Sequence, residues 1–384
     1  YSSAASDMAK RQLKASYGLV GNDQIGGDRR FIYNETVIGG GKYYFGTTPS
    51  QYTSVRLGEF PNPNVGWEKA KKLNLGADLS FFNQLNISVD YFKENREGIF
   101  LQRKSIPMYV GLSTKPWVNI GKMRNSGIDA SLEYHQPLGK DLHLTVRGNF
   151  TYARNRIMDQ DEPDYAYTYM NHSGQMQWQK FGLVAAGLFQ DQEDIDSWAK
   201  QSFGEVKPGD IKYLDLNGDG IVDNYDTKPI GYSDIPEIVY GFGFSLQWKA
   251  FDLSAFFQGV AHVSFSTLTD QTQAFVGRNL KESSVFADLY GNTWTPENPG
   301  AKYPRMTTGA IDNNNQLSTF WMANGRYLRL KNLELGYTLP KRIANKIAMQ
   351  SLRVYLSGVN LFTFSPFKLW DPDPVSYTHL TLPT

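Results

Sequence analysis

The residues whose chemistry is most specific lie between Asp215 and Asp226, where the sequence reads DLNGDGIVDNYD. Oxygen-bearing side chains stand at alternate positions, and Gly220 follows them where a sharp turn requires positive φ. Carboxylate, amide and backbone carbonyl oxygens are the ligands that Ca²⁺ prefers. We therefore predict one calcium ion held by Asp215, Asn217, Asp219, Asp223, Asp226 and the backbone carbonyl of Ile221.

The spacing of these residues is that of a known kind of calcium loop. Counted from Asp215, the side chains occupy positions 1, 3, 5, 9 and 12 of an EF-hand-type loop, with Ile221 at position 7. Position 12 is Asp226 rather than the longer bidentate glutamate, and no pair of amphipathic helices flanks the loop. The segment is therefore similar to a dockerin-type loop, and the alternative is an Asp/Asn/Gly-rich turn without metal.

Tyrosines at alternate positions of a long polar stretch, with a tryptophan after them, form a second and weaker candidate site. Their rings could stack on a sugar or contact a partner protein, because aromatic faces suit apolar sugar surfaces. The alternative is ordinary packing within the loop, which the abundance of tyrosine in this chain favours. The candidates are Tyr165, Tyr167, Tyr169 and Trp178.

Catalytic patterns are missing from the sequence. The chain has no cysteine, which excludes disulfides, thiol catalysis and Cys-ligated zinc. Its five histidines are scattered without metal spacing, and there is no GxSxG elbow. The glycines at 39–41 precede Lys42 and Tyr43, so the hydroxyl of a phosphate loop is lacking. We predict that the protein is not an enzyme.

Composition favours one large β architecture over several small domains. Aromatic residues make up 14% of the 384 residues, with 23 Tyr and 23 Phe, and the net charge is only +1. A net charge this small gives no excess of basic residues that would attract nucleic acid. The longest apolar run, Phe181 to Phe189, is far shorter than the roughly 18 residues of a spanning helix. The first residues show no signal-peptide pattern, and we expect the chain to begin within a longer protein.

Apolar and polar residues alternate over long runs from Lys72 onward, which predicts β-strands with one apolar face. The predicted hairpins join Leu73–Phe81 to Leu85–Tyr91, Ile128–Tyr134 to Leu142–Tyr152, and Tyr240–Trp248 to Phe251–Phe257. Two further strands run from Arg326 to Leu339 and from Leu352 to Phe362, and a change of parity between Leu330 and Leu333 predicts a β-bulge. Long polar loops separate these hairpins at 158–177, 190–237 and 267–316.

Short turns at one end and long loops at the other are the layout of an outer-membrane β-barrel. The runs are about ten residues long, against about 5–6 for an average strand. Aromatic residues such as Tyr91, Tyr152 and Trp248 cluster at their ends, where interfacial girdles occur. Alternation alone also fits a soluble barrel with its apolar face inward. We favour lipid outside and a watery lumen inside.

Six segments in chain order resemble SusC/RagA-type TonB-dependent outer-membrane transporters. No segment is specific alone, but together they extend over most of the chain. They are LKASYGLVGN (Leu13 to Asn22), the hairpin from Asn62 to Phe92, NIGKMRNSGIDASLEY (Asn119 to Tyr134), the calcium-type segment from Gly209 to Gly231, GRYLRLKNLELGYTLP (Gly325 to Pro340), and the segment from Leu352 to Asp373.

The resemblance implies an all-β antiparallel transmembrane barrel of 22 strands with an N-terminal plug. It further implies import driven through the TonB complex, and a SusD-like surface lipoprotein that captures oligosaccharides or peptides at the outer membrane of a Gram-negative bacterium. The sequence shows no plug or TonB box and about ten strands, so we expect residues 1–373 to be the C-terminal part of such a barrel. Residues 374–384 have no strand signal, and we predict a non-native tail.

Two other hypotheses compete with the transporter. One is a secreted soluble calcium-binding β-protein that binds carbohydrate, and the other, which we favour least, is a membrane-barrel enzyme. The need for detergent separates the transporter from the soluble protein, since only the former should fold exclusively in lipid or detergent.

Overall fold

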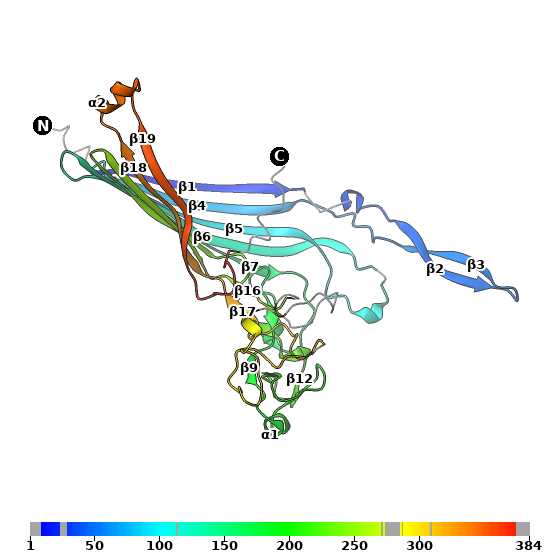
Figure 1. Cartoon of the computed structure of the whole chain (residues 1–384). Coiled ribbons are helices and arrows are strands. Elements are labelled where there is room, and N and C mark those ends of the chain that lie inside the picture. The colour runs from blue at the N-terminus through cyan, green and yellow to red at the C-terminus, as the bar shows by residue number, and fades with distance from the viewer. Residues whose placement is uncertain are drawn as a thin grey trace.

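The computed structural model describes residues 9–23, 29–112, 114–269, 272, 285, 287–307 and 309–373. Its main element is a curved, nine-stranded antiparallel sheet (Figure 1). In spatial order the strands are β1 (Ala9–Asn22), β4 (Glu68–Phe81), β5 (Leu85–Gln102), β6 (Trp117–Pro137), β7 (Leu142–Asp159), β14 (Ile238–Trp248), β15 (Phe251–Ala261), β18 (Tyr327–Thr338) and β19 (Arg353–Phe364).

Smaller elements lie in the connections. The hairpin of β2 (Val37–Phe45) and β3 (Ser50–Leu57) projects beyond the sheet. The short strands are β8 (Phe181–Gly182), β9 (Ala185–Leu188), β10 (Lys200–Gln201), β11 (Ile211–Tyr213), β12 (Ile221–Val222), β13 (Lys228–Pro229), β16 (Ser264–Ser266) and β17 (Met322–Asn324). The helices are α1 (Gln192–Asp196) and α2 (Lys341–Ala344), and 3-10 turns span Arg29–Phe31, Met108–Val110, Thr168–Met170, Asn224–Asp226, Ala287–Leu289 and Asn345–Ile347.

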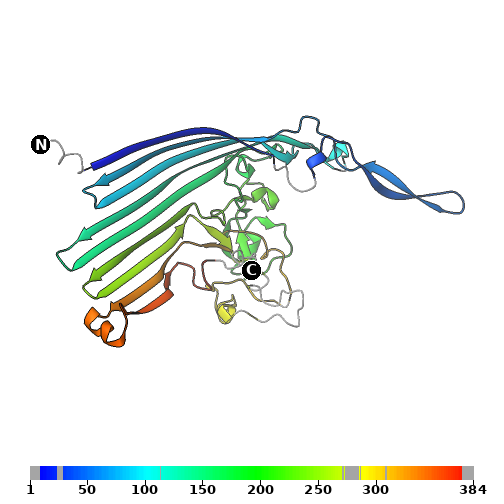
Figure 2. The same ribbon diagram turned by 90° about the horizontal axis from the view of Figure 1, so that it is seen from above.

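The two ends of the sheet differ in their connections, as predicted. At one end, which we call the turn end, the strands are joined by residues 82–84, 138–141, 249–250 and 339–352. At the other, the loop end, they are joined by residues 23–67, 103–116, 160–237 and 262–326. Figure 2 shows the hairpin turns together on the left and the loops together on the right. In the turn after β4, Phe82 and Asn83 have φ values of 54° and 52°, as a type I′ turn requires.

The strand pairing confirms the alternation predicted from the sequence. Leu79 pairs with Ile87, Ala130 with Phe150, and Leu246 with Leu253, so apolar side chains of neighbouring strands share one face. The predicted bulge is present, because Lys331 is skipped between paired Leu330 and Asn332 in the registers with both β15 and β19.

The apolar face of the sheet is exposed. Large side chains on it that are more than a third accessible include Leu13, Leu75, Val89, Leu132, Phe150, Phe244, Leu335 and Leu356. A soluble sandwich or barrel would bury this face, because a contiguous apolar patch of such extent is rare on soluble monomers. The exposed face therefore supports the membrane barrel over the soluble alternative. None of the helices in the described part of the chain is long and apolar enough to cross a membrane.

The best-buried core lies in the loops and not in the sheet. It is formed by Leu183, Leu188, Ile211, Tyr213, Val222, Leu289, Trp294, Tyr303 and Trp321. The apolar run at Phe181–Phe189 supplies part of it, and the pairs β9–β11, β10–β12 and β8–β13 hold its strands. The described residues of two connections that are distant in sequence, 160–237 and 262–326, thus form one packed assembly at the loop end, which we call the loop assembly. It lies below the sheet in Figure 1.

Candidate functional site

The face of the sheet opposite the apolar one is polar, and we call it the inner face. The loop assembly covers part of it. At its turn end Lys14 Nζ lies 2.9 Å from Asp78 Oδ1 and 3.6 Å from Asp90 Oδ2. A Cβ at Gly76 would collide with the Asp90 carboxylate, so this position needs glycine to leave room for the ion pairs. Gly336 does the same for the pair Arg353–Asp252. Such a charged face is compatible with water and not with lipid.

The histidines His135 and His143 lie on this polar face, as expected. His135 contacts Glu133 at 3.2 Å and Thr145 at 3.1 Å, while His143 is on the neighbouring strand, opposite Pro137. His172 and His262 lie in the connections, and His379 falls outside the described residues. No group of three or more His, Asp or Glu within the described residues is arranged to hold a metal ion.

The calcium-type loop is closed by its own side chains. Asp215 accepts hydrogen bonds from the amides of Gly218 at 2.7 Å and Gly220 at 2.8 Å. Asp219 accepts from the amide of Ile221 at 2.8 Å. Gly218 and Gly220 have φ values of 77° and 84°, which favour glycine. The loop therefore folds around its own side-chain oxygens, and the calcium ion stays a prediction.

Asp226 has a different environment from the other predicted ligands. It is fully buried, and its oxygens accept from the amides of Leu216 at 2.7 Å and Asp223 at 2.8 Å. Asp223 in turn caps the 3-10 turn by accepting from the amide of Tyr225. Asp226 thus ties the end of the loop to its start, and a calcium ion would have to share oxygens that already accept backbone bonds. The side-chain oxygens of Asp215, Asn217 and Asp219 accept backbone bonds as well, so the same holds for positions 1, 3 and 5.

Two of the four predicted aromatic residues, Tyr167 and Tyr169, contact this loop. The rings of Tyr167 and Tyr169 stack at 5.4 Å, and Tyr225 meets Tyr167 edge-on at 6.2 Å. Tyr169 also donates to the carbonyl of Tyr225 at 2.7 Å. These contacts join residues 160–170 to the calcium-type loop and give the two tyrosines a packing role. Tyr165 packs on His172 instead, and Trp178 is 63% exposed with φ of 65°.

A buried ion pair organises the loop assembly. Asp210, fully buried, lies 2.7 Å from Arg305 Nε and accepts from Asn314 Nδ2 at 2.9 Å. Tyr213 donates to the carbonyl of Asn313 at 2.9 Å, and burial raises the pKa of its phenol. Sequence reasoning missed this network, because its partners are about a hundred residues apart and no local pattern marks them.

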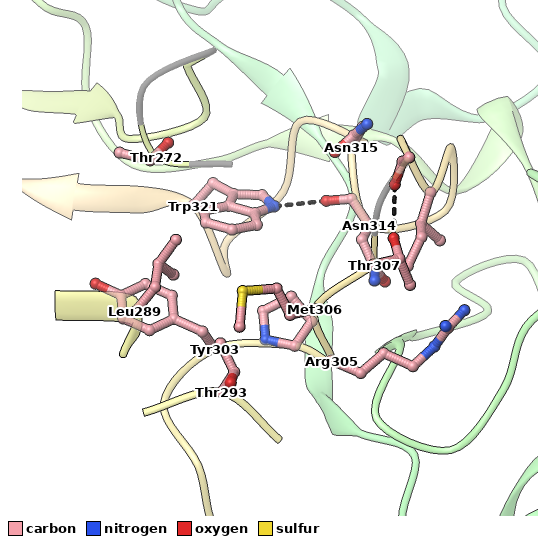
Figure 3. Close-up of a pocket in the computed structure, with 13 residues that line it drawn as sticks. Thr272, Leu289, Thr293, Tyr303, Arg305, Met306, Thr307, Asn314, Asn315 and Trp321 are labelled. Atoms are coloured by element: carbon pink, nitrogen blue, oxygen red, sulfur yellow. Dashed lines mark hydrogen bonds between the residues drawn. The ribbon is translucent and has the colours of Figure 1, made fainter. Parts of the chain in front are cut away.

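The cavity beside this network is too small for a nutrient. Figure 3 shows Trp321, Leu289, Tyr303 and Met306 around it, with the Arg305 guanidinium turned away. Its volume is about 50 Å³. A water molecule takes about 30 Å³ in the liquid. The cavity therefore has room for water alone.

A larger cavity of about 360 Å³ lies where the loops meet the inner face of the sheet. We call it the loop-end cavity. Its walls come from β5, β6 and β7 and from residues 176–177 and 233–237. At its edge Glu237 is only 4% exposed, and Arg154 holds it through bonds of 2.6 and 2.7 Å. Burial alone would raise the pKa of the Glu237 carboxyl, but hydrogen bonds from Arg154 and His262 hold that pKa below its usual value.

Comparison with known proteins identifies relatives over nearly the whole chain. The family model "TonB dependent receptor-like, beta-barrel" matches residues 13–361. The TonB-dependent receptor P3 of Formosa agariphila is 30% identical over 373 residues, which cover 94% of this chain and 35% of that relative. The TonB-dependent receptor SusC of Bacteroides thetaiotaomicron is 25% identical over 391 residues, covering 95% and 35%. The chain therefore spans about a third of the length of these relatives.

A solved structure with the same arrangement of strands is the RagAB peptide importer in its open-open state. It matches with a TM-score of 0.67 at 23% sequence identity, covering 95% of this chain and 38% of that one. At this identity the likeness concerns the fold. It agrees with the long antiparallel strands, short turns and long loops described above.

Proposed function

Because this chain belongs to the TonB dependent receptor-like, beta-barrel family and is a SusC-type barrel segment, we propose that its full-length protein imports a nutrient across the outer membrane of a Gram-negative bacterium. The observation that carries the proposal is the sheet with one exposed apolar face and one charged face. In a closed barrel these faces would meet lipid and a watery lumen respectively. The nutrient is an oligosaccharide or a peptide, and no bond is made or broken during its passage.

The unpaired edges of the sheet support the proposal that this chain is part of a larger barrel. Within the described residues β1 and β19 each pair with one neighbour only, and a bilayer does not tolerate unpaired backbone groups. The missing strands and a plug would come from the part of the protein that the relatives possess and this chain does not span. Energy would reach the barrel from the TonB complex through that part.

A SusD-like surface lipoprotein would act as the partner at the loop end. The loop assembly there has its own packed core, so it can offer a defined surface to such a lid. Trp178, exposed on this assembly, is the predicted aromatic residue best placed to contact the lid or a sugar. The lipoprotein should copurify with the full-length protein from outer membranes.

We also propose that Ca²⁺ stiffens the loop at 215–226. The backbone carbonyl of Ile221 would bind the ion together with side-chain oxygens of Asp215, Asn217, Asp219, Asp223 and Asp226, and Asp226 also ties the ends of the loop. The support is the ligand spacing together with the two glycines at positive φ. The ion would cross-link the segment that Tyr167 and Tyr169 pack against.

Energised uptake tests the import proposal. Cells that express the full-length protein should accumulate a labelled oligosaccharide or peptide pool, and deletion of the gene should abolish this accumulation. A protonophore should abolish it as well, because the energy comes from the inner membrane. Equal accumulation of both pools with and without the gene would refute the proposal.

A further inference from the structure

The loop-end cavity contains a row of amide side chains whose position is fixed by strand register. Glu94 of β5 pairs with Asn125 of β6, and Asn125 pairs with Asn155 of β7. Side chains directly opposite in neighbouring strands have Cβ atoms about 5 Å apart. Gln177 from the covering loop joins the row, since its backbone amide donates to Asn155 Oδ1 at 2.6 Å. Three amides therefore converge on one cavity from two strands and one loop.

These amides have unused hydrogen-bonding capacity. Within the described part of the chain, the side chains of Asn125 and Gln177 make no hydrogen bond, and the Nδ2 of Asn155 makes none either. Each primary amide carries both donors and an acceptor. A ligand that presents a donor beside an acceptor could pair with them, as the backbone of a peptide does.

The charges around the cavity neutralise one another. Arg96 bonds Glu94 at 2.7 Å and Glu68 at 2.8 Å. Lys72 lies 3.3 Å from Glu94, and Glu237 is held by Arg154 and His262. No strong excess of either sign faces the ligand, so the cavity favours neutral hydrogen-bonding groups over anionic or cationic ones.

Apart from Ser233, the rest of the lining is aliphatic or thioether. Met123, Met176, Ile235 and Pro236 contribute to the wall, and none of the described lining residues is aromatic. Methionine side chains adapt to ligands of varied shape. A sugar ring would lack the flat aromatic face that suits its apolar surface. The lining therefore favours varied aliphatic side chains over pyranose rings.

From this combination we infer that the loop-end cavity binds a short peptide. Asn125, Asn155 and Gln177 pair with its backbone, and the methionine wall receives its side chains. The volume of about 360 Å³ falls within the range of about 300–1,000 Å³ for ligand sites. The inference rests on the proposed import function and narrows it from two nutrient classes to one.

Binding by the full-length protein, purified from outer membranes in detergent, tests this inference. The probes are a pool of mixed-sequence tetrapeptides with blocked ends and a pool of neutral gluco-oligosaccharides. The parent should retain peptides. Asn125→Leu and Asn155→Leu remove hydrogen-bonding groups at similar volume, and each should weaken retention about tenfold, the equivalent of one or two lost hydrogen bonds. Gln247→Leu, on the same face of the sheet but outside the cavity, is the matched control and should bind like the parent.

Each outcome has a separate meaning. Retention of oligosaccharides without peptides would overturn the inference and leave import intact. Peptide retention that both asparagine variants preserve would also overturn it, because the cavity would then not be the site. Loss of peptide retention in Gln247→Leu to the same degree would do so too. Peptide binding without energised uptake in cells would support the site and contradict the import proposal.

Discussion

At the scale of single residues, buried carboxylates at the loop end carry more stability than the charged pairs on the strands. The Glu237 side chain is 4% exposed and is bonded by both Arg154 and His262, whereas Lys122 and Asp159 lie 3.8 Å apart with about half of each side chain exposed. Breaking a buried pair leaves one charge uncompensated, while exposed pairs contribute little.

Glu237→Gln should therefore destabilise the protein by about 1–3 kcal/mol, a range reduced because Arg154 is one-third exposed. Asp159→Asn is the control and should change stability by less than about 0.5 kcal/mol. Thermal unfolding of the detergent-purified full-length protein, followed by circular dichroism, measures both. Equal melting temperatures for the two variants would show that the Glu237 network is not stabilising.

The pH dependence of this contribution has a definite sign. The folded-state pKa of Glu237 lies below its unfolded value, so the stabilisation is present above the unfolded pKa of about 4.3 and is lost as the pH falls through the folded pKa. The difference in stability between the parent and Glu237→Gln should thus shrink on acidification below about pH 4.

Buried carboxylates and their distant partners could not be predicted from the sequence. No local sequence pattern links Glu237 to Arg154 or Asp210 to Asn314, because the members of each pair are far apart in the sequence and come from different elements. The calcium-type ligands were predictable because their spacing lies within one short loop. The difference is one of sequence distance, since local patterns reveal local geometry only.

At the scale of elements, alternation predicted the hairpin strands and the face that each side chain takes. Leu79 and Ile87 share one face because side chains alternate with a period of two, and the bulge at Lys331 lies where that period shifts. The loop assembly was not predicted, because its core residues, such as Ile211 and Val222, lie in polar segments without any hydrophobic period. The projecting β2–β3 hairpin was missed as well.

The calcium-type loop gives an element-scale prediction. Isothermal titration of the full-length protein with CaCl₂ should show binding, and Asp219→Ala should abolish it, since Asp219 supplies an exposed oxygen at position 5. Glu205→Ala is the control, because it removes one exposed acidic charge outside the loop and should bind Ca²⁺ like the parent. A parent protein without any calcium signal would end the proposal.

At the scale of the whole molecule, the sheet has the dimensions of a membrane-spanning wall. Ile238 to Trp248 rises roughly 33 Å along the strand at about 3.3 Å per residue, which a tilt of about 40° reduces to about 25 Å, the height of the apolar band of outer-membrane barrels. Trp248, Phe251 and Tyr337 form a run of adjacent rings at the turn end, where an interfacial girdle belongs.

Residues 374–384, predicted to be a non-native tail, lie outside the described residues. The assignment of residues 1–373 to the C-terminal part of the barrel remains a prediction. It agrees with a family match over residues 13–361 and with relatives about three times as long as this chain.

Single-cysteine labelling of β14 shows which face of the sheet meets lipid and which meets water. This chain has no cysteine. In the full-length protein in liposomes, with any cysteine outside this chain replaced, an environment-sensitive dye can therefore be placed by Phe244→Cys, Ser245→Cys or Leu246→Cys. Brominated lipids should quench the dye at 244 and 246 and spare 245, where a water-soluble quencher should act. The opposite parity, with 245 in lipid and its neighbours in water, would contradict the account.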